Sequence, residues 1–171
     1  MYSSRNLTHL PKLPESLTDY CKYNQLTDIP KLPEGLTVLG CWNNQLTDIP
    51  KLPENLITLY CNNNQLTVIP KLPESLTQLD CNNNKLTQLP KLPEGLTVLY
   101  CRYNKLTDIP KLPKNVRYVS VDFKFLKVVH ELNTKERYIK VYNLYKNVML
   151  IMSDKFKLPY DLKRMLVGFL F

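Results

Sequence analysis

Five cysteines are the residues of this chain best suited to covalent or metal chemistry, and they recur at a fixed spacing of 20 residues. They are Cys21, Cys41, Cys61, Cys81 and Cys101. An odd number at one long spacing is not a disulfide framework. A free cysteine otherwise behaves as a small buried hydrophobe. The spacing therefore predicts a ladder of reduced cysteines in a core, which favours a reducing compartment such as the cytosol.

Other chemistry finds little support in the residue types present. A zinc site needs Cys and His ligands at short spacing, whereas the two histidines are His9 and His130, at opposite ends of the repeated region. The same separation leaves no nucleophile, base and orienting group together. Four glycines form no phosphate-binding loop. We therefore predict no enzyme activity, no cofactor, no metal and no small-molecule substrate.

The cysteines belong to a 20-residue repeat that extends from residue 7 to about residue 129. The copy that starts at Leu36 reads LTVLGCWNNQLTDIPKLPEG. A unit this short cannot bury its own apolar face, so it folds only by stacking on copies of itself. About six copies would form one solenoid over residues 1–130, and the last, atypical copy places Val121 in the cysteine position. Such a stack offers an extended surface, which favours recognition over catalysis.

Each copy predicts a strand followed by an extended return path. In the first full copy the residues predicted to point inward are Leu36, Leu39, Cys41, Leu46 and Ile49. The alternation around Leu39 predicts a short strand, and strands of successive copies would form one parallel sheet on the concave side. Two prolines in the four residues P-K-L-P forbid a helix and favour polyproline II on the convex side.

Two polar patterns repeat with the same period. An asparagine after each strand is predicted to bond backbone groups of its own and neighbouring turns. These residues are Asn24, Asn44, Asn64, Asn84 and Asn104. Lysine and glutamate columns on the convex side are interpreted as solubility features. They are Lys31, Lys51, Lys71, Lys91 and Lys111, and Glu34, Glu54, Glu74 and Glu94.

The period changes after residue 130, and residues 131–171 are predicted to form a helical cap or tail. Apolar residues recur at spacings of three and four over residues 138–152, and Pro159 suits the first turn of a second helix. Two helices would close the C-terminal end of the solenoid. No comparable cap precedes residue 7, so self-association through the N-terminal end is possible.

The positive charge is concentrated in the C-terminal part. The formal net charge is +8; residues 1–110 hold ten basic and ten acidic side chains, and residues 111–171 hold thirteen and five. A solvated lysine-rich surface accounts for this better than nucleic-acid binding, which would rest on charge alone. No signal segment opens the chain and no run of eighteen apolar residues is present, so we expect no membrane association.

The string L-P-E-x-L-x-x-L-x-C-x-x-N-x-L-T-x-I/L-P-x-L-P resembles the short, bacterial-type leucine-rich repeats. These occur in secreted effectors of the YopM and IpaH type, and similar cysteine-bearing repeats occur in large DNA viruses. The resemblance implies an α/β-repeat solenoid that binds a protein partner, as a viral or bacterial host-interaction protein in the host cytoplasm. No cysteine follows Cys101, so the ligase chemistry of IpaH-type proteins is not implied.

A second resemblance concerns the C-terminal tail. Its pattern, Leu158-Pro159-x-x-Leu162-x-x-x-Leu166-x-x-x-Leu170, is similar to the opening of an F-box and to the PRANC tail of poxviral ankyrin-repeat proteins. This implies an alternative function, a substrate adaptor for a cullin-type ubiquitin ligase. The match covers thirteen residues of common composition, and a role in capping the solenoid is the simpler interpretation.

Outward positions of the concave sheet are the candidate partner-binding site, because the repeat itself makes no demand on them. They hold the one tryptophan of the chain, together with tyrosines and an arginine, residue types that are frequent in binding hot spots. The candidates are Trp42, Tyr60, Asp80, Tyr100 and Arg102. The competing interpretation is that the tyrosines only pack along an exposed sheet.

Overall fold

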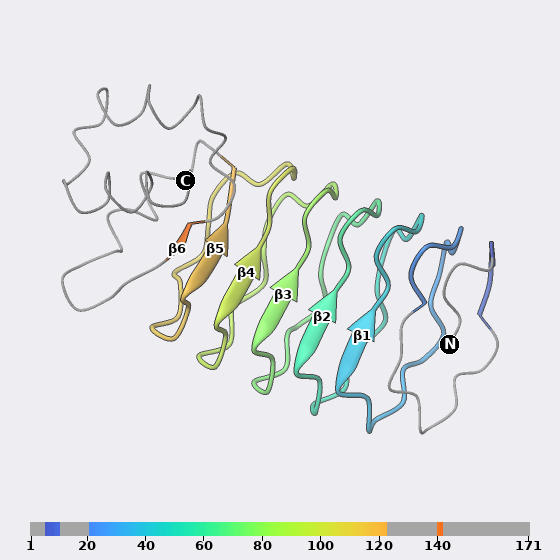
Figure 1. The fold of residues 1–171 in the computed structure, drawn as a ribbon, viewed down its shortest axis with the longest axis horizontal. Coiled ribbons are helices and arrows are strands. Elements are labelled where there is room, and N and C mark those ends of the chain that lie inside the picture. The colour runs from blue at the N-terminus through green and yellow to red at the C-terminus, as the bar shows by residue number, and fades with distance from the viewer. Residues whose placement is uncertain (1–5, 11–20, 123–139, 142–171) are drawn as a thin grey trace, which may run out of the picture. The chain divides into compact units, whose positions relative to one another are not determined.

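The computed structural model describes residues 6–10, 21–122 and 140–141 (Figure 1). The chain divides into two compact units, Met1–Lys140 and Val141–Phe171. Every described residue except Val141 belongs to the first unit. The helices predicted within residues 131–171, the end of the atypical last copy and the tail residues from Leu158 to Leu170 therefore lie outside the described residues.

The described copies form a parallel sheet, as the alternation around Leu39 predicts. Its strands are β1 (Val38–Gly40), β2 (Thr58–Tyr60), β3 (Gln78–Asp80), β4 (Val98–Tyr100) and β5 (Tyr118–Ser120). They lie in sequence order, and each residue pairs with the residue 20 positions later. β6 (Lys140–Val141) comes after β5 in the strand order. The five strands from β1 to β5 thus follow one another at four intervals of 20 residues. The strand expected before β1 falls partly within residues 11–20, which are not described.

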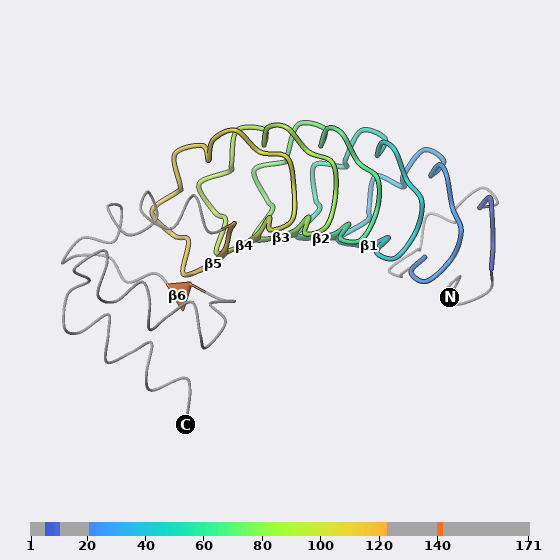
Figure 2. The ribbon, with the colours of Figure 1, turned by 90° about the horizontal axis from the view of Figure 1, so that it is seen from above.

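The core is a column of leucine, isoleucine and cysteine side chains stacked between the sheet and the return path. Leu36, Leu39, Cys41 and Leu46 are almost completely buried, and Ile49 is 6% exposed. The equivalent described residues of the following copies are buried too, except Ile109, which is half-buried, and Val121 fills the cysteine position of the last copy. The predicted inward positions are confirmed. Figure 2 shows the sheet on the inner side of the arc that these turns make, with the proline-rich path on the outer side.

Each return path ends in a tight turn that leads into the next strand. The carbonyl of Pro33 accepts a hydrogen bond from the amide of Leu36, at 3.2 Å, and the same bond recurs in the later copies. No helix occurs in residues 21–122. Among the described residues, no helix is long and apolar enough to cross a membrane.

The asparagine ladder is confirmed atom by atom. In one rung, Asn64 Nδ2 donates to the carbonyls of Cys41, at 3.0 Å, and of Cys61, at 3.1 Å. Its Oδ1 accepts from the amide of Leu46, at 3.0 Å. Each amide thus joins two successive turns and satisfies backbone groups that the short strands leave unpaired. The ladder holds the strands in register, and with them the outward side chains of the sheet.

Candidate functional site

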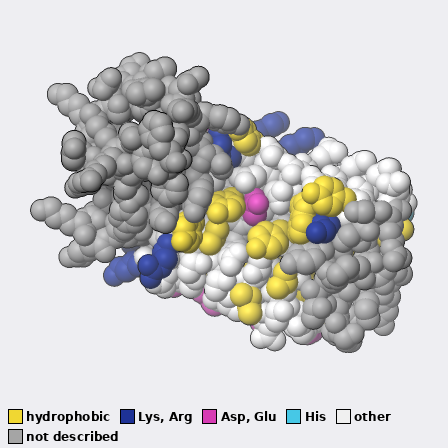
Figure 3. Space-filling model, viewed as in Figure 1, with side chains coloured by type: hydrophobic (Ala, Val, Ile, Leu, Met, Phe, Trp, Pro, Cys, Tyr) yellow, Lys and Arg dark blue, Asp and Glu magenta, His cyan; other side chains and the backbone are white. Residues whose placement is uncertain are grey.

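The concave face is defined here as the outward side chains of β1 to β5 and of the residue two positions after each strand. All five predicted binding residues lie on it. All five are half-buried, so part of each residue packs against the protein and part is accessible to a partner. They are Trp42, Tyr60, Asp80, Tyr100 and Arg102. Figure 3 shows hydrophobic side chains gathered over the middle of this face on both sides of an acidic group.

Three aromatic rings lie edge to face at the N-terminal side of the concave face. The rings of Trp42 and Tyr60 have centroids 5.8 Å apart and planes at 87°, and those of Tyr23 and Trp42 are 6.4 Å apart at 73°. Such T-shaped pairs are a favoured aromatic geometry. Lys22 Nζ lies 4.7 Å from the centre of the Trp42 ring, in a cation–π contact. Tyr23, Trp42 and Tyr60 are called the aromatic cluster below.

The ring of Tyr60 is also held from its polar end. Its hydroxyl donates to Gln78 Oε1 on the next strand, at 3.0 Å. Contact with Trp42 on one side and this hydrogen bond on the other fix the ring over β2 and β3. A ring fixed before binding loses little conformational entropy when a partner arrives.

Asp80 lies in the middle of the sheet, in register with Tyr60 on one side and Tyr100 on the other. One carboxylate oxygen, Oδ1, accepts from the amide of Asn82, at 3.1 Å. Burial raises the pKa of Asp80, because it penalises the charged form, and the hydrogen bond from Asn82 partly offsets this.

Arg102 lies on the C-terminal side of the concave face, three repeats beyond Trp42 and one before its last position, Asp122. Its amide donates to Asn82 Oδ1, at 2.7 Å, and its guanidinium carbon lies 4.5 Å from the centre of the Tyr103 ring. The structure therefore brings Trp42 and Tyr60 into contact and sets Asp80 beside Tyr60 and Tyr100, while it places Arg102 against Tyr103.

Tyr23 and Tyr103 are exposed residues of this region that the sequence analysis did not single out. They are 53% and 50% exposed, and both adopt left-handed backbone conformations, with φ of 54° and 56°. The equivalent residues of the copies between them are asparagines, a residue type that tolerates this region well. A tyrosine in place of asparagine just before the ladder asparagine, as in CKYN and CRYN, is the signal that could have identified them.

The cysteine ladder offers no accessible nucleophile. All five thiols are free and buried, as predicted. Burial raises the pKa of Cys21 to about 11 and that of Cys101 to about 12, so the thiols stay protonated at neutral pH. Within residues 6–10 and 21–122, no group of three or more His, Cys, Asp and Glu residues could hold a metal ion.

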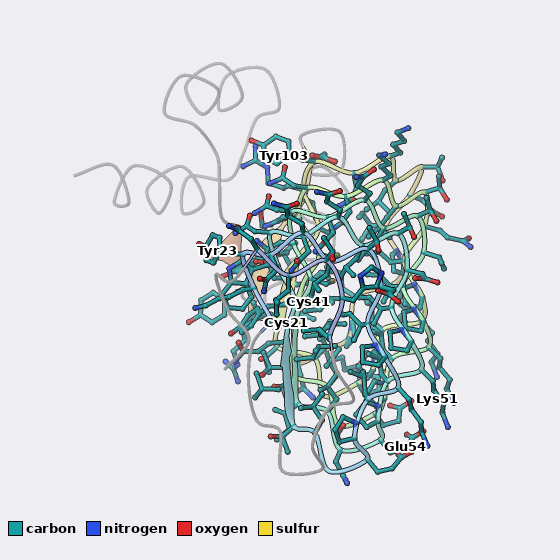
Figure 4. The ribbon with its side chains drawn as sticks, turned by 90° about the vertical axis from the view of Figure 1, so that its right-hand side faces the viewer. Cys21, Tyr23, Cys41, Lys51, Glu54 and Tyr103 are labelled. Carbon is teal, nitrogen blue, oxygen red and sulfur yellow. The ribbon has the colours of Figure 1, made fainter. Side chains whose placement is uncertain are left out.

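The convex side carries the predicted charge columns, and their side chains are exposed. An ion pair joins Lys31 and Glu34 at 3.7 Å, between side chains that are 88% and 75% exposed. Exposed pairs of this kind contribute little to stability. Figure 4 shows Lys51 and Glu54 on the side away from Tyr23 and Tyr103, with Cys21 and Cys41 between the two sides.

Comparisons with known proteins agree on the kind of repeat. The family model for Leucine Rich repeats (2 copies) matches residues 54–94. No curated protein sequence matches the chain. Among solved structures, YopM from Yersinia enterocolitica WA-314 is similar, with 36% identity over 68% of this chain and 26% of that protein, at a TM-score of 0.67.

Two further structures support the same assignment. YopM from Yersinia pestis is 36% identical over 70% of this chain and 35% of its own, at a TM-score of 0.64. A Shigella effector leucine-rich-repeat domain is 26% identical over 82% of this chain and 79% of its own, at a TM-score of 0.60. The chain spans about a quarter to a third of the length of the two YopM structures. Together with the repeat, the parallel sheet and the asparagine ladder, these matches show that the chain is a solenoid of leucine-rich repeats similar to the short, bacterial type.

Proposed function

We propose that this chain is a non-catalytic recognition protein whose concave face binds a protein partner. The observation that carries the proposal is the aromatic cluster. Tyr23, Trp42 and Tyr60 contact one another edge to face at 6.4 and 5.8 Å, and Tyr23 is 53% exposed. Fixed aromatic side chains with accessible surface supply much of the binding energy in protein interfaces.

The contrast between the two sides of the solenoid supports this choice of surface. The convex side repeats one lysine and one glutamate column with little variation, as solubility alone would require. The concave face changes from copy to copy, and its position two residues after the strand is Trp42, Asn62, Asn82, Arg102 and Asp122 in turn. Variation on a constant scaffold is how repeat proteins acquire a specific partner.

The similarity to effector proteins supports a more specific role. Because the most similar structures reported above are effectors of Yersinia and Shigella, we propose a host-interaction protein that acts in the host cytoplasm. Five free, buried thiols suit a reducing compartment of this kind.

The single tryptophan provides a direct test. A partner is isolated by affinity capture and identified by mass spectrometry, and the purified partner is then titrated into the full chain while Trp42 fluorescence is followed. Binding at the concave face should shift or quench the emission in a saturable manner, because contact removes water from the indole. Tight binding without any change at Trp42 would contradict the proposed surface.

A further inference from the structure

The central column of the concave face has a symmetrical composition. Asp80 on β3 pairs in register with Tyr60 on β2 and Tyr100 on β4. Beyond the tyrosines, the column ends in two small residues, Gly40 on β1 and Ser120 on β5. An acidic group thus stands between two aromatic rings, with less side-chain bulk at both ends of the row. Figure 3 shows an acidic side chain near the middle of this face, with hydrophobic side chains on both sides of it.

The spacing of the two tyrosines suits a flat or narrow group between them. Residues two parallel strands apart are separated by roughly 9.6 Å at the backbone. The sheet lies on the inner side of the arc in Figure 2, where outward groups lie closer together than their backbones, and the hydroxyl of Tyr60 donates to Gln78 on β3. A group that touches both rings at carbon contact distance needs a separation of about 7 to 8 Å. The curvature of the sheet therefore favours a ring separation below the backbone spacing.

The carboxylate of Asp80 has room for a further donor. It accepts the amide of Asn82 through Oδ1, whereas a carboxylate offers about four acceptor positions. Within the described residues, no lysine or arginine lies within ion-pair distance of it. Burial raises the pKa of Asp80, because the contacts of the ionised carboxylate in the free protein do not fully replace the water that it loses. An incoming cation would supply that compensation.

We infer that the concave face binds an arginine or lysine side chain of its protein partner, seated against Asp80 between Tyr60 and Tyr100. The inference rests on the proposed function and adds the chemistry of the group that is recognised. A cation is attracted by the carboxylate and by the faces of both tyrosine rings. An anion would be repelled, and an apolar group would bury the carboxylate further without pairing it. Charge complementarity therefore selects a basic side chain.

Small probes test the subsite by itself. The full chain is titrated with acetyl-arginine methylamide and, in parallel, with acetyl-citrulline methylamide, which has nearly the same shape and no charge. NMR follows the carboxyl carbon of Asp80 and the ring signals of Tyr60 and Tyr100. We expect saturable shifts with the arginine probe, an affinity roughly tenfold above that for the citrulline probe, and a lower pKa of Asp80 in the complex.

Two variants complete the test. Asp80→Asn keeps the oxygen that accepts from Asn82 and should abolish the preference for arginine. Asp48→Asn removes an exposed acidic side chain and should leave the preference intact. Equal affinity for both probes, no saturable shift, or an unchanged preference in Asp80→Asn would overturn the inference. An Asp80 pKa below the ordinary value in the free full chain would also overturn it, because a cation of the chain itself would then occupy the site.

The experiments distinguish failure of the basic-residue site at Asp80 from failure of the proposed binding surface. If a partner changes the fluorescence of Trp42 while the arginine probe shows no preference, the concave face is the binding surface and Asp80 is not its basic-residue site. If the probe binds as expected and the partner leaves Trp42 unchanged, the subsite is present and the proposed binding surface is wrong.

Discussion

At the scale of single residues, the concave face keeps side chains in arrangements that a purely structural solenoid would avoid. Asp80 holds a carboxylate in a half-buried position beside two tyrosines. In the turn next to this face, Tyr23 and Tyr103 take left-handed backbone conformations, which cost about 1 to 2 kcal/mol for residues with a β-carbon. Local conflicts of this kind are expected at functional sites, where binding rather than stability selects the residue.

Replacing Asp80 should change the pH dependence of the free energy of unfolding, and this change would reveal the conflict. Because folding raises the pKa of Asp80, the ionised side chain lowers stability above its folded pKa and has no such effect below the ordinary value of 3.8. Asp80→Asn should therefore raise the free energy of unfolding at pH 7, and the gain should disappear in acid. Urea unfolding at both pH values measures it. A variant less stable than the parent at pH 7 would mean that Asp80 stabilises the fold.

The buried thiols should make the protein sensitive to alkali. Folding raises the cysteine pKa, so above the ordinary value of 9.0 the unfolded chain binds fewer protons and stability falls as the pH rises. Each titrating thiol contributes a slope of up to about 1.4 kcal/mol per pH unit. Cys61→Val should remove the contribution of one thiol to this slope. Val121 shows that valine fits the equivalent position. Urea unfolding between pH 8 and 10, roughly spanning the ordinary thiol pKa, measures the slope.

Thiol labelling at neutral pH checks the same assignment. Labelling of the native chain should be slow and should become complete only on denaturation, because all five cysteines are buried. Rapid labelling of three or more cysteines without denaturant would contradict the position of the ladder.

At the scale of the repeated elements, the asparagine rungs connect successive turns beside strands that are only three residues long. The side chain of Asn64 makes four hydrogen bonds to backbone groups of two turns. Asn64→Ala should lower the free energy of unfolding by about 3 kcal/mol, because it leaves buried backbone groups unpaired. Gln65→Ala, an exposed neighbour, is the matched control and should change it by less than about 0.5 kcal/mol. Similar losses for both variants in urea unfolding would show that the ladder has no special role.

The repeated elements are also where prediction from sequence worked best. A period of 20 residues places one residue type at the same point of every turn, so the positions of Leu39, Cys41 and Asn44 could be derived from packing and hydrogen bonding alone. The bond from Tyr60 to Gln78 and the contact of Arg102 with Tyr103 could not be derived. These outward side chains are not repeated, and their orientation depends on rotamers and neighbours that no period determines.

At the scale of the whole molecule, the C-terminal segment separates two interpretations of the chain. Leu162, Leu166 and Leu170 lie outside the described residues, and both the capping role and the adaptor role remain predictions. Deleting residues 158–171 should lower thermal stability or solubility if the segment covers the solenoid end. A truncated chain that stays equally stable and monomeric would favour the adaptor role, which a binding assay with cullin-ligase components would then test.

The position of the binding surface is the central claim, and one comparison of affinities tests it most directly. Affinity for the captured partner is measured by calorimetry for the parent chain, Trp42→Ala, Tyr60→Ala and Lys51→Ala. Truncating either aromatic residue should weaken binding about thirtyfold, or about 2 kcal/mol, because each forms part of the fixed cluster. Lys51→Ala should change affinity less than about threefold, since its charge is exposed on the convex side. If Lys51→Ala weakens binding more than the two aromatic variants, the partner binds elsewhere and the account is wrong.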